Sequence, residues 1–217
     1  MMEKPIIFNS EMVLTILEGR KTQTRRVMKT PPPEDMTVDA ICVEWYVPSI
    51  IDKDGYEDAG DEIFGAYDVY GEWGAKCPYG APGDKLWVRE TWNVLNSDGC
   101  TPRGISPQPD RVVYQANGGD QYPFWRPSIF MPRWASRIQL RITNVRVERV
   151  RDISVEDAYA EGVRNPFYGR GTVGGDFSVV NVMFPELWDS INAKRGHSWQ
   201  SNPWVWVIEF EKVKPEC

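Results

Sequence analysis

The sequence predicts an α+β fold built on a small β-barrel, with helices packed at the openings of the barrel and with insertions. Segments of strand periodicity occur near both ends of the chain, and the regular strand–helix alternation of a doubly wound sheet is absent. Within a long strand expected over 137–150, the apolar positions change parity between Ile142 and Val145. Such a shift indicates a bulge or sharp bend, by which small barrels curve.

The length of 217 residues suits a single domain, 1–217, and is sufficient for a hydrophobic core without crosslinks. Two stretches, at about 30–80 and 93–123, are expected to be insertions into this domain. The first begins with three consecutive prolines and contains an acidic, turn-rich part, and we expect it to form a small sheet of its own. The second is loop-like and rich in proline and glycine.

Individual elements follow from apolar periodicity and from capping residues. Ser10 is expected to cap a helix over 11–18, because its hydroxyl can accept from the free amides of the first turn. Ser154 and Asp157 resemble a capping box, and Gly162 is the expected glycine after the last turn of that second helix. The full set of expected strands and helices is 5–8, 11–18, 20–27, 41–47, 85–92, 137–150, 155–161, 184–192 and 204–212.

Charge and hydropathy narrow the class of partner. The formal net charge is −6, whereas proteins that wrap duplex DNA are usually basic, so duplex DNA is not the expected ligand. A local basic patch could still bind a small anion or a short stretch of RNA. No apolar stretch is long enough to cross a bilayer, and the N-terminus has no signal-peptide pattern, so we expect a cytoplasmic protein without a membrane partner.

Cysteine and histidine usage argues against a metal site. Cys42, Cys77, Cys100 and Cys217 are scattered and form no CxxC pair, so free thiols are expected. His197 is the single histidine, which leaves a Ser-His-Asp triad or a His-rich metal site without some of its parts. We therefore expect neither a metal nor an organic cofactor.

The segment from Gly19 to Arg26 is the densest candidate for function, and we expect it to floor a polar cleft. It places Lys21 beside two threonines, one of them Thr24, and adds three arginines. A lysine removed from water can lose its proton and act as a base, and a threonine hydroxyl needs such a base to become a nucleophile. The same residues could also be a solvated basic helix end, since the helix dipole favours cations there.

The run Gly19-x-Lys21-Thr22-x-Thr24-x-Arg26 resembles the signature of the ASCH domain family, a branch of the PUA-like β-barrels. Four further segments resemble that family in the same order, over about two thirds of the chain. They are the Gly-Asp turn and strand at 82–88, the central strand at 141–150, the helix ending in Ala-Glu-Gly at 154–162 and the closing strand at 204–213. The full-length pattern also resembles prophage-encoded members, and the insertions are not covered.

One branch of this family is similar to N4-acetylcytidine amidohydrolases, which use a lysine, a threonine and a glutamate. The resemblance implies that Lys21 is the base, Thr24 the nucleophile and Glu161 the proton donor and acceptor. It also implies an acylated nucleobase or nucleoside as substrate. The residues expected to position or bind the ligand are Arg25, Arg26, Glu90, Trp92, Arg137 and Arg141.

Two alternatives to an enzyme stay open. The family also contains members proposed only to bind RNA, so the same cleft could hold a nucleobase or an RNA end without catalysis. A phage protein that acts on a host partner through its insertions is the third interpretation. Burial of Lys21, Thr24 and Glu161 in one packed set would favour the enzyme, and an open groove with Lys21 in solvent would favour the binding module.

Overall fold

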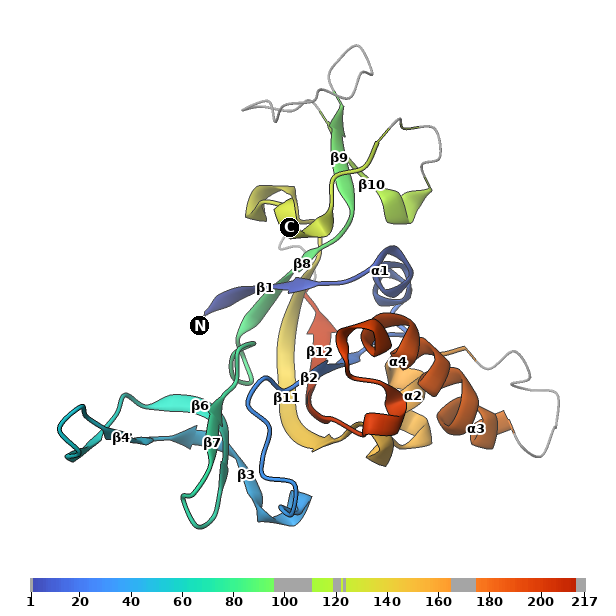
Figure 1. Ribbon diagram of the computed structural model, residues 1–217. Helices are drawn as coiled ribbons and strands as arrows, with labels where there is room; N and C mark the ends of the chain where they lie inside the picture. Colours follow the sequence, from blue (N-terminus) through green and yellow to red (C-terminus); the bar gives the residue numbers. More distant parts are fainter. Residues whose placement is uncertain (1, 96–110, 119–121, 123, 165–174, 214–217) are drawn as a thin grey trace.

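The chain has a mixed α+β fold organised around one five-stranded sheet (Figure 1). The computed structural model describes residues 2–95, 111–118, 122, 124–164 and 175–213. The strand order is β1-β8-β11-β12-β2, and all neighbours are antiparallel except β1 and β8. The strands are β1 (Glu3–Ile7), β8 (Lys85–Arg89), β11 (Gln139–Arg149), β12 (Trp204–Lys212) and β2 (Gln23–Val27). The predicted α+β class is confirmed.

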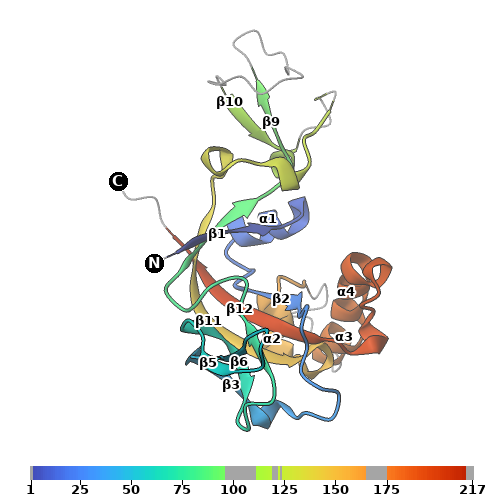
Figure 2. The same cartoon turned by 60° about the vertical axis from the view of Figure 1, so that its left-hand side comes forward.

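The predicted irregularity in the central strand is confirmed. The register between β11 and β12 shifts between Ile142 and Asn144, so that positions of the opposite parity face the core beyond this point. The two long strands run side by side through the molecule (Figure 2). Within the described residues, β1 pairs only with β8 and β2 only with β12, so the sheet has two free edges and no closed barrel is found. The barrel stays a prediction.

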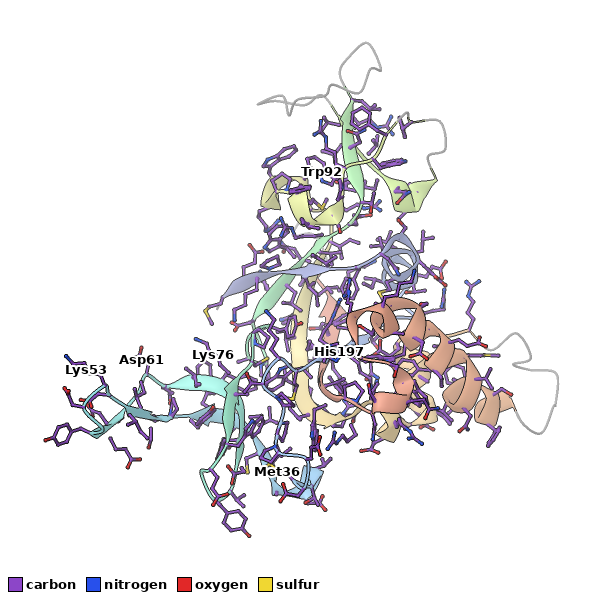
Figure 3. All side chains as sticks on the ribbon, in the orientation of Figure 1. Met36, Lys53, Asp61, Lys76, Trp92 and His197 are labelled. Carbon is purple, nitrogen blue, oxygen red and sulfur yellow. The ribbon has the colours of Figure 1, made fainter. Side chains whose placement is uncertain are left out.

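Residues 38–76 form sheets of their own. A short 3-10 turn (Val38–Ala40) leads into a three-stranded sheet of β3 (Ile41–Tyr46), β6 (Ile63–Asp68) and β7 (Gly74–Lys76). The hairpin of β4 (Ser49–Ile51) and β5 (Glu57–Ala59) extends from it as an arm. Phe64 and Ala66 belong to the main core, which anchors the sheet. Lys53 lies at the tip of the arm and Asp61 at its base, and both are far from His197 (Figure 3).

A second small lobe continues from the end of β8. It contains the antiparallel pair β9 (Trp92–Leu95) and β10 (Arg111–Tyr114) and three 3-10 turns, at Gln115–Asn117, Ser128–Phe130 and Arg133–Ala135. Trp92, Val94, Met131 and Ala135 form its separate core. The strand predicted over 85–92 is therefore two strands, because the chain turns at Glu90 and Thr91 to enter this lobe.

Helices pack on both faces of the sheet. Helix α1 (Ser10–Leu17) is capped by Asn9 and not by Ser10, because the Asn9 side chain accepts from the Met12 amide at 2.8 Å. Ser154 caps α2 (Val155–Ala160) as predicted, accepting from the Asp157 amide at 3.1 Å. The remaining helical segments are Val150–Asp152, α3 (Gly175–Ser178), a π-helical turn at Val179–Met183, α4 (Phe184–Asn192), Ala193–Arg195 and Trp199–Ser201.

Strand β12 is buried on both faces. Trp204, Trp206, Ile208 and Phe210 point into the main core, as the alternation predicts, and the main core also receives α1. Val205 and Val207 pack on the other face in a second cluster with Val150, Ile153, Ala158, Val179, Phe184 and Trp188. The fold thus clamps β12 and its neighbour β2 between α1 on one side and α2 and α4 on the other.

Two of the four cysteines, Cys42 and Cys77, are free thiols, and Cys100 and Cys217 lie outside the described residues. No helix in the described part of the chain has both the length and the apolar character needed to span a membrane.

Candidate functional site

The segment before β2 is bonded to the C-terminal end of α2. Three successive residues donate to three successive carbonyls: Arg20 Nη1 to Gly162 at 2.9 Å, Lys21 Nζ to Glu161 at 2.9 Å and the Thr22 amide to Ala160 at 2.8 Å. The last carbonyls of a helix have no partner within the helix and carry partial negative charge. The side chains of Arg20 and Lys21 therefore cap α2, a helix distant in sequence, while the backbone amides of the same two residues donate to Thr15 O at the end of α1, at 2.9 and 3.1 Å.

Lys21 and Glu161 form a buried ion pair. The Lys21 amine is 2.6 Å from Glu161 Oε2, and the two side chains are 0% and 5% exposed. Burial lowers the pKa of the Lys21 amine below its ordinary value, because a charge is costly away from water. The Glu161 carboxylate acts in the opposite direction, and the charges of Arg26 and Arg25 act with burial. A lysine with a lowered pKa is the form suited to act as a base.

The second oxygen of Glu161 belongs to a larger charged network. Arg25 Nη1 lies 3.3 Å from Glu161 Oε1, and Arg25 Nη2 contacts both Glu148 and, at 2.8 Å, Asp157 Oδ2. Arg146 Nη2 reaches the same Asp157 oxygen at 2.6 Å. Burial acts to raise the pKa of Asp157, but the hydrogen bonds and charges of the two arginines outweigh it and lower that pKa. The Arg25 guanidinium thus forms ion pairs with three carboxylates, those of Glu148, Asp157 and Glu161.

A cavity of about 510 Å³ lies beside these pairs, and we call it the β2 cavity. Six consecutive residues, 24–29, line it. Because neighbours in a strand point to opposite faces, a cavity that all six touch lies along the free edge of β2 and not on one face of the sheet. The other lining residues are Met12, Tyr79, Glu161, Phe184, Leu187, Trp188, Ile191, Asn192, Arg195 and His197.

The edge of β2 offers backbone groups to this cavity. The Phe210 amide donates to Thr22 O at 2.8 Å and the Met28 amide to Trp204 O at 3.0 Å, so even-numbered residues of β2 bond to β12. The amides and carbonyls of Arg25 and Val27 consequently point away from β12. Nowhere in the described residues do these four groups have a hydrogen-bond partner. A ligand in the β2 cavity can therefore be met by main-chain donors and acceptors.

Glu161 links the other two expected catalytic residues, because it contacts Lys21 and lines the same cavity as Thr24. Thr24 is buried and shares the β2 cavity with Glu161, and Glu161 holds Lys21. Lys21 itself does not line the cavity. Among the described residues no hydrogen bond joins the Thr24 hydroxyl to either Lys21 or Glu161. Strand β2 begins only at Gln23, so Lys21 precedes it and turns toward α2.

Glu90 and Arg137 form a different site from the one expected. They make a two-pronged ion pair in which Arg137 Nε and Nη2 lie 2.9 Å from the two Glu90 oxygens. Arg137 also donates to Asn117 Oδ1 at 2.9 Å and stacks on the Tyr114 ring with its guanidinium carbon 4.0 Å from the centroid. Neither residue lines the β2 cavity. The pair ties the second lobe to the main sheet, because β10 and the turn after it supply Tyr114 and Asn117.

Trp92 and Arg141 also lie outside the β2 cavity. The Trp92 side chain is fully buried in the small core of the second lobe, and its ring meets Trp134 edge-on. It has no free face on which a base could stack, which corrects the expectation drawn from its position near a loop. Arg141 is half exposed and pairs with Glu211 at 2.8 Å on the solvent side of the sheet. It extends no basic track into the cavity.

Sequence reasoning missed the wall of the cavity formed by α4. Phe184, Leu187, Trp188 and Ile191 lie at spacings of three and four, so they share one helix face. That amphipathic pattern was a readable signal for burial. The pattern does not indicate which face of the sheet the helix covers. Residues that line a cavity therefore cannot be distinguished by this pattern from residues of the closed hydrophobic core.

Comparison of the chain with protein-family models, with curated proteins and with solved structures finds no match. Within the described residues, no group of three or more His, Cys, Asp and Glu side chains is arranged to hold a metal ion. What the site can do is therefore inferred from its own geometry.

Proposed function

We propose that the chain is an ASCH-type, PUA-like cytoplasmic amidohydrolase that removes an acyl group from the exocyclic amine of a modified base or nucleoside, with N4-acetylcytidine as the model. The observation that carries the proposal is the buried Lys21–Glu161 pair beside a cavity that contains Thr24. In this proposal the five-stranded sheet represents the family's barrel, and the segments at about 30–80 and 93–123 are insertions into it.

The ion pair supplies both an acid and a base from a single proton. Moving that proton from Lys21 Nζ to Glu161 Oε2, across 2.6 Å, converts two charged groups into a neutral amine and a neutral carboxylic acid. Burial favours this neutral form, since neither group then has to be charged away from water. Arg25 at 3.3 Å from the other oxygen favours the ionised form and so limits the shift.

The reaction would proceed in two balanced steps. The Thr24 oxygen attacks the acyl carbon while its proton passes to neutral Lys21, and the carbon–nitrogen bond breaks as Glu161 protonates the leaving amine. Water then attacks the resulting ester, giving one proton to Glu161, while Lys21 returns its proton to Thr24 and the carboxylic acid leaves. The first transfer requires the Lys21 amine to turn from Glu161 toward Thr24.

The β2 cavity suits a nucleoside in size and in chemistry. Its volume of about 510 Å³ lies within the range of small-molecule sites, roughly 300–1,000 Å³. The apolar face of α4 offers rings and aliphatic groups against which a base can stack. The outward amides and carbonyls of Arg25 and Val27 can bond the edge of the base, which presents donors and acceptors of its own.

A non-catalytic nucleotide- or RNA-binding module is the second candidate, and one specific observation favours it. The Thr24 hydroxyl has no hydrogen bond to Lys21 among the described residues, whereas an activated nucleophile needs its base within about 2.6–3.2 Å, or somewhat farther without ligand. In this alternative the Lys21–Glu161 pair only fixes α2 against β2, and Thr24 is an ordinary donor to the ligand.

Turnover of N-acylated cytidines and cytosines by the purified protein, followed by mass spectrometry, tests the proposal. The wild type and Thr24→Ser should release the free amine, and Thr24→Val should not, because valine keeps the shape of threonine without its oxygen. If the wild type acts on none of the panel while a cytidine ligand binds in the β2 cavity, the binding module is the better description.

A further inference from the structure

Arg26, Lys29 and Arg195 line the β2 cavity without carboxylate partners. Arg26 and Lys29 come from the edge strand and the residues after it, and Arg195 comes from the turn that follows α4. None of the three has an Asp or Glu oxygen within ion-pair distance in the part of the chain that the structure describes. We propose that they bind the phosphate group of a nucleotide, so that the ligand of this cavity is a phosphorylated nucleoside.

The neighbouring cations are not available for this role. Lys21 is bonded to Glu161. The Arg25 side chain is 1% exposed, and its guanidinium is shared among three carboxylates. Lys29 and Arg195 are exposed to solvent, so an incoming anion can reach them without breaking an ion pair. Lys21 and Arg25 are thus paired with carboxylates inside the protein. Among the described residues, Arg26, Lys29 and Arg195 have no carboxylate partner and line the cavity.

Arg26 is held in place by the protein and keeps one donor without a partner. Its guanidinium lies 5.0 Å from the centroid of the Phe8 ring and donates from Nη2 to the Ile7 carbonyl at 2.6 Å. Arg26 Nε is buried and has no hydrogen-bond partner. Burial lowers the pKa of Arg26; the charges of Tyr79 and Glu161 act in the opposite direction, and the positive charge of Arg195 acts with burial. An anion placed between the two arginines would offset both the burial and the mutual repulsion.

The balance of charge within the cavity favours the same ligand. Glu161 is the single carboxylate among the lining residues, and its oxygens already accept from Lys21 and Arg25. Arg26, Lys29 and Arg195 therefore leave a local excess of positive charge on a protein whose formal net charge is −6. Arginine guanidinium groups match phosphate oxygens in geometry, and phosphate contacts are a general source of affinity for nucleotides.

The inference rests on the proposed function for the base and adds the phosphate. A base stacked on the apolar face of α4 would lie beside Thr24 and Glu161, and the phosphate would lie toward the exposed Lys29 and Arg195. Phosphate could come from a free mononucleotide or from a nucleotide within an RNA chain. These two sources share the chemistry that the three cations recognise, so they are distinguished by the ligands offered.

Calorimetric titration of cytidine, cytidine 5′-monophosphate, and a short oligoribonucleotide with and without a 5′-phosphate tests the proposal without depending on turnover. The phosphorylated ligands should bind at least about tenfold more tightly than their unphosphorylated forms. Arg195→Gln and Lys29→Gln should each remove most of that difference and leave cytidine binding unchanged. Lys194→Gln is the matched control, since Lys194 is exposed and adjacent to Arg195 but does not line the cavity.

The inference is overturned if neither phosphorylated ligand binds more tightly than its unphosphorylated form, if Arg195→Gln weakens both forms equally, or if none of the four ligands binds. A phosphate-dependent gain confined to the oligoribonucleotide supports it and identifies RNA as the source. A gain without any turnover of N-acyl cytidines supports the phosphate site while the amidohydrolase proposal fails. Turnover of N-acyl cytidine without tighter binding of the phosphorylated ligands supports the amidohydrolase proposal, while the phosphate site fails.

Discussion

Lys21 donates to the same residue twice: its amine is 2.9 Å from the main-chain carbonyl of Glu161 and 2.6 Å from the carboxylate of that residue. One bond caps the end of α2, and the other forms the buried ion pair. A structural and a chemical role therefore meet in one side chain. Loss of activity on removing Lys21 cannot alone identify a base, because the helix that carries Glu161 would lose its attachment as well.

Replacing Lys21 should therefore destabilise the protein. Lys21→Met leaves the Glu161 carboxylate buried with only the more distant Arg25, and breaking a buried pair in this way costs about 3–5 kcal/mol. Lys21→Met/Glu161→Gln should recover part of that loss, because the unpaired charge is gone. Urea denaturation monitored by tryptophan fluorescence measures both. Arg141→Met, at the exposed pair with Glu211, is the control and should change stability by about 1 kcal/mol or less.

The rate of amide hydrolysis should fall as pH rises through the lowered pKa of Lys21. The single proton that the Lys21–Glu161 pair shares is the one that Glu161 gives to the leaving amine, and burial brings the pKa of this lysine below 10.5. The pH profile of kcat/KM for an N-acyl cytidine should thus decline at high pH with a midpoint below pH 10.5. Lys21→Arg should be inactive across the profile, since guanidinium stays protonated and cannot accept the Thr24 proton. A wild-type rate that shows no decline up to pH 10.5 would contradict the shared proton.

The same shift has a consequence for stability, with a definite sign. Between the lowered pKa of folded Lys21 and 10.5, the unfolded chain binds more protons at this position than the folded chain. The contribution of Lys21 to the free energy of unfolding therefore increases as pH rises across that window. Comparing wild type with Lys21→Met by urea denaturation across the window isolates this contribution, because other titrating groups are common to both proteins.

Features that depend on neighbours in sequence were predictable. The parity change near Ile142 predicted the bulge in β11, and Ser154 predicted the cap of α2. Asn9 and Ser10 are both residue types that commonly cap a helix. Only the fold determines that the Asn9 side-chain Oδ1, and not the Ser10 hydroxyl, accepts from an amide of the first turn, that of Met12. Local pattern therefore identified the elements but not every boundary.

Contacts between distant segments were not predictable from pattern. The pairing of Lys21 with Glu161 joins positions 140 residues apart, and it was expected only from a family resemblance. Trp92 and Arg137 are residue types that often bind ligands. The turn after β8 places Trp92 in the core of the second lobe and Glu90 within reach of Arg137, so neither residue lines the cavity. Residue type gives the chemistry that a side chain can do, and the tertiary path of the chain decides where it does it.

Gly162→Ala should disturb the site through the backbone. Gly162 has φ +94°, and an added β-carbon would lie 3.0 Å from the Thr15 hydroxyl oxygen and 3.4 Å from the Lys21 β-carbon. The left-handed backbone alone costs about 1–2 kcal/mol for a residue with a side chain. Gly83→Ala is the matched control, because Gly83 has the same φ with nothing within 4 Å of the added carbon. Gly162→Ala should lower the free energy of unfolding by more than this control, and equal losses would refute the contact.

Asp157 should make the protein sensitive to acid through Arg25 and Arg146. Burial opposes ionisation of Asp157, yet the two arginines bring its pKa below the ordinary 3.8, so folding favours the charged form. The stabilisation is fully present above pH 3.8 and is lost as pH falls through the lower pKa of the folded state. The difference in unfolding free energy between wild type and Asp157→Asn should therefore be constant near neutral pH and shrink below about pH 4. Arg146→Gln removes one donor and should move this loss to higher pH. An Asp157→Asn difference that persists unchanged to pH 2 would mean that the carboxylate is held by packing and not by its charge.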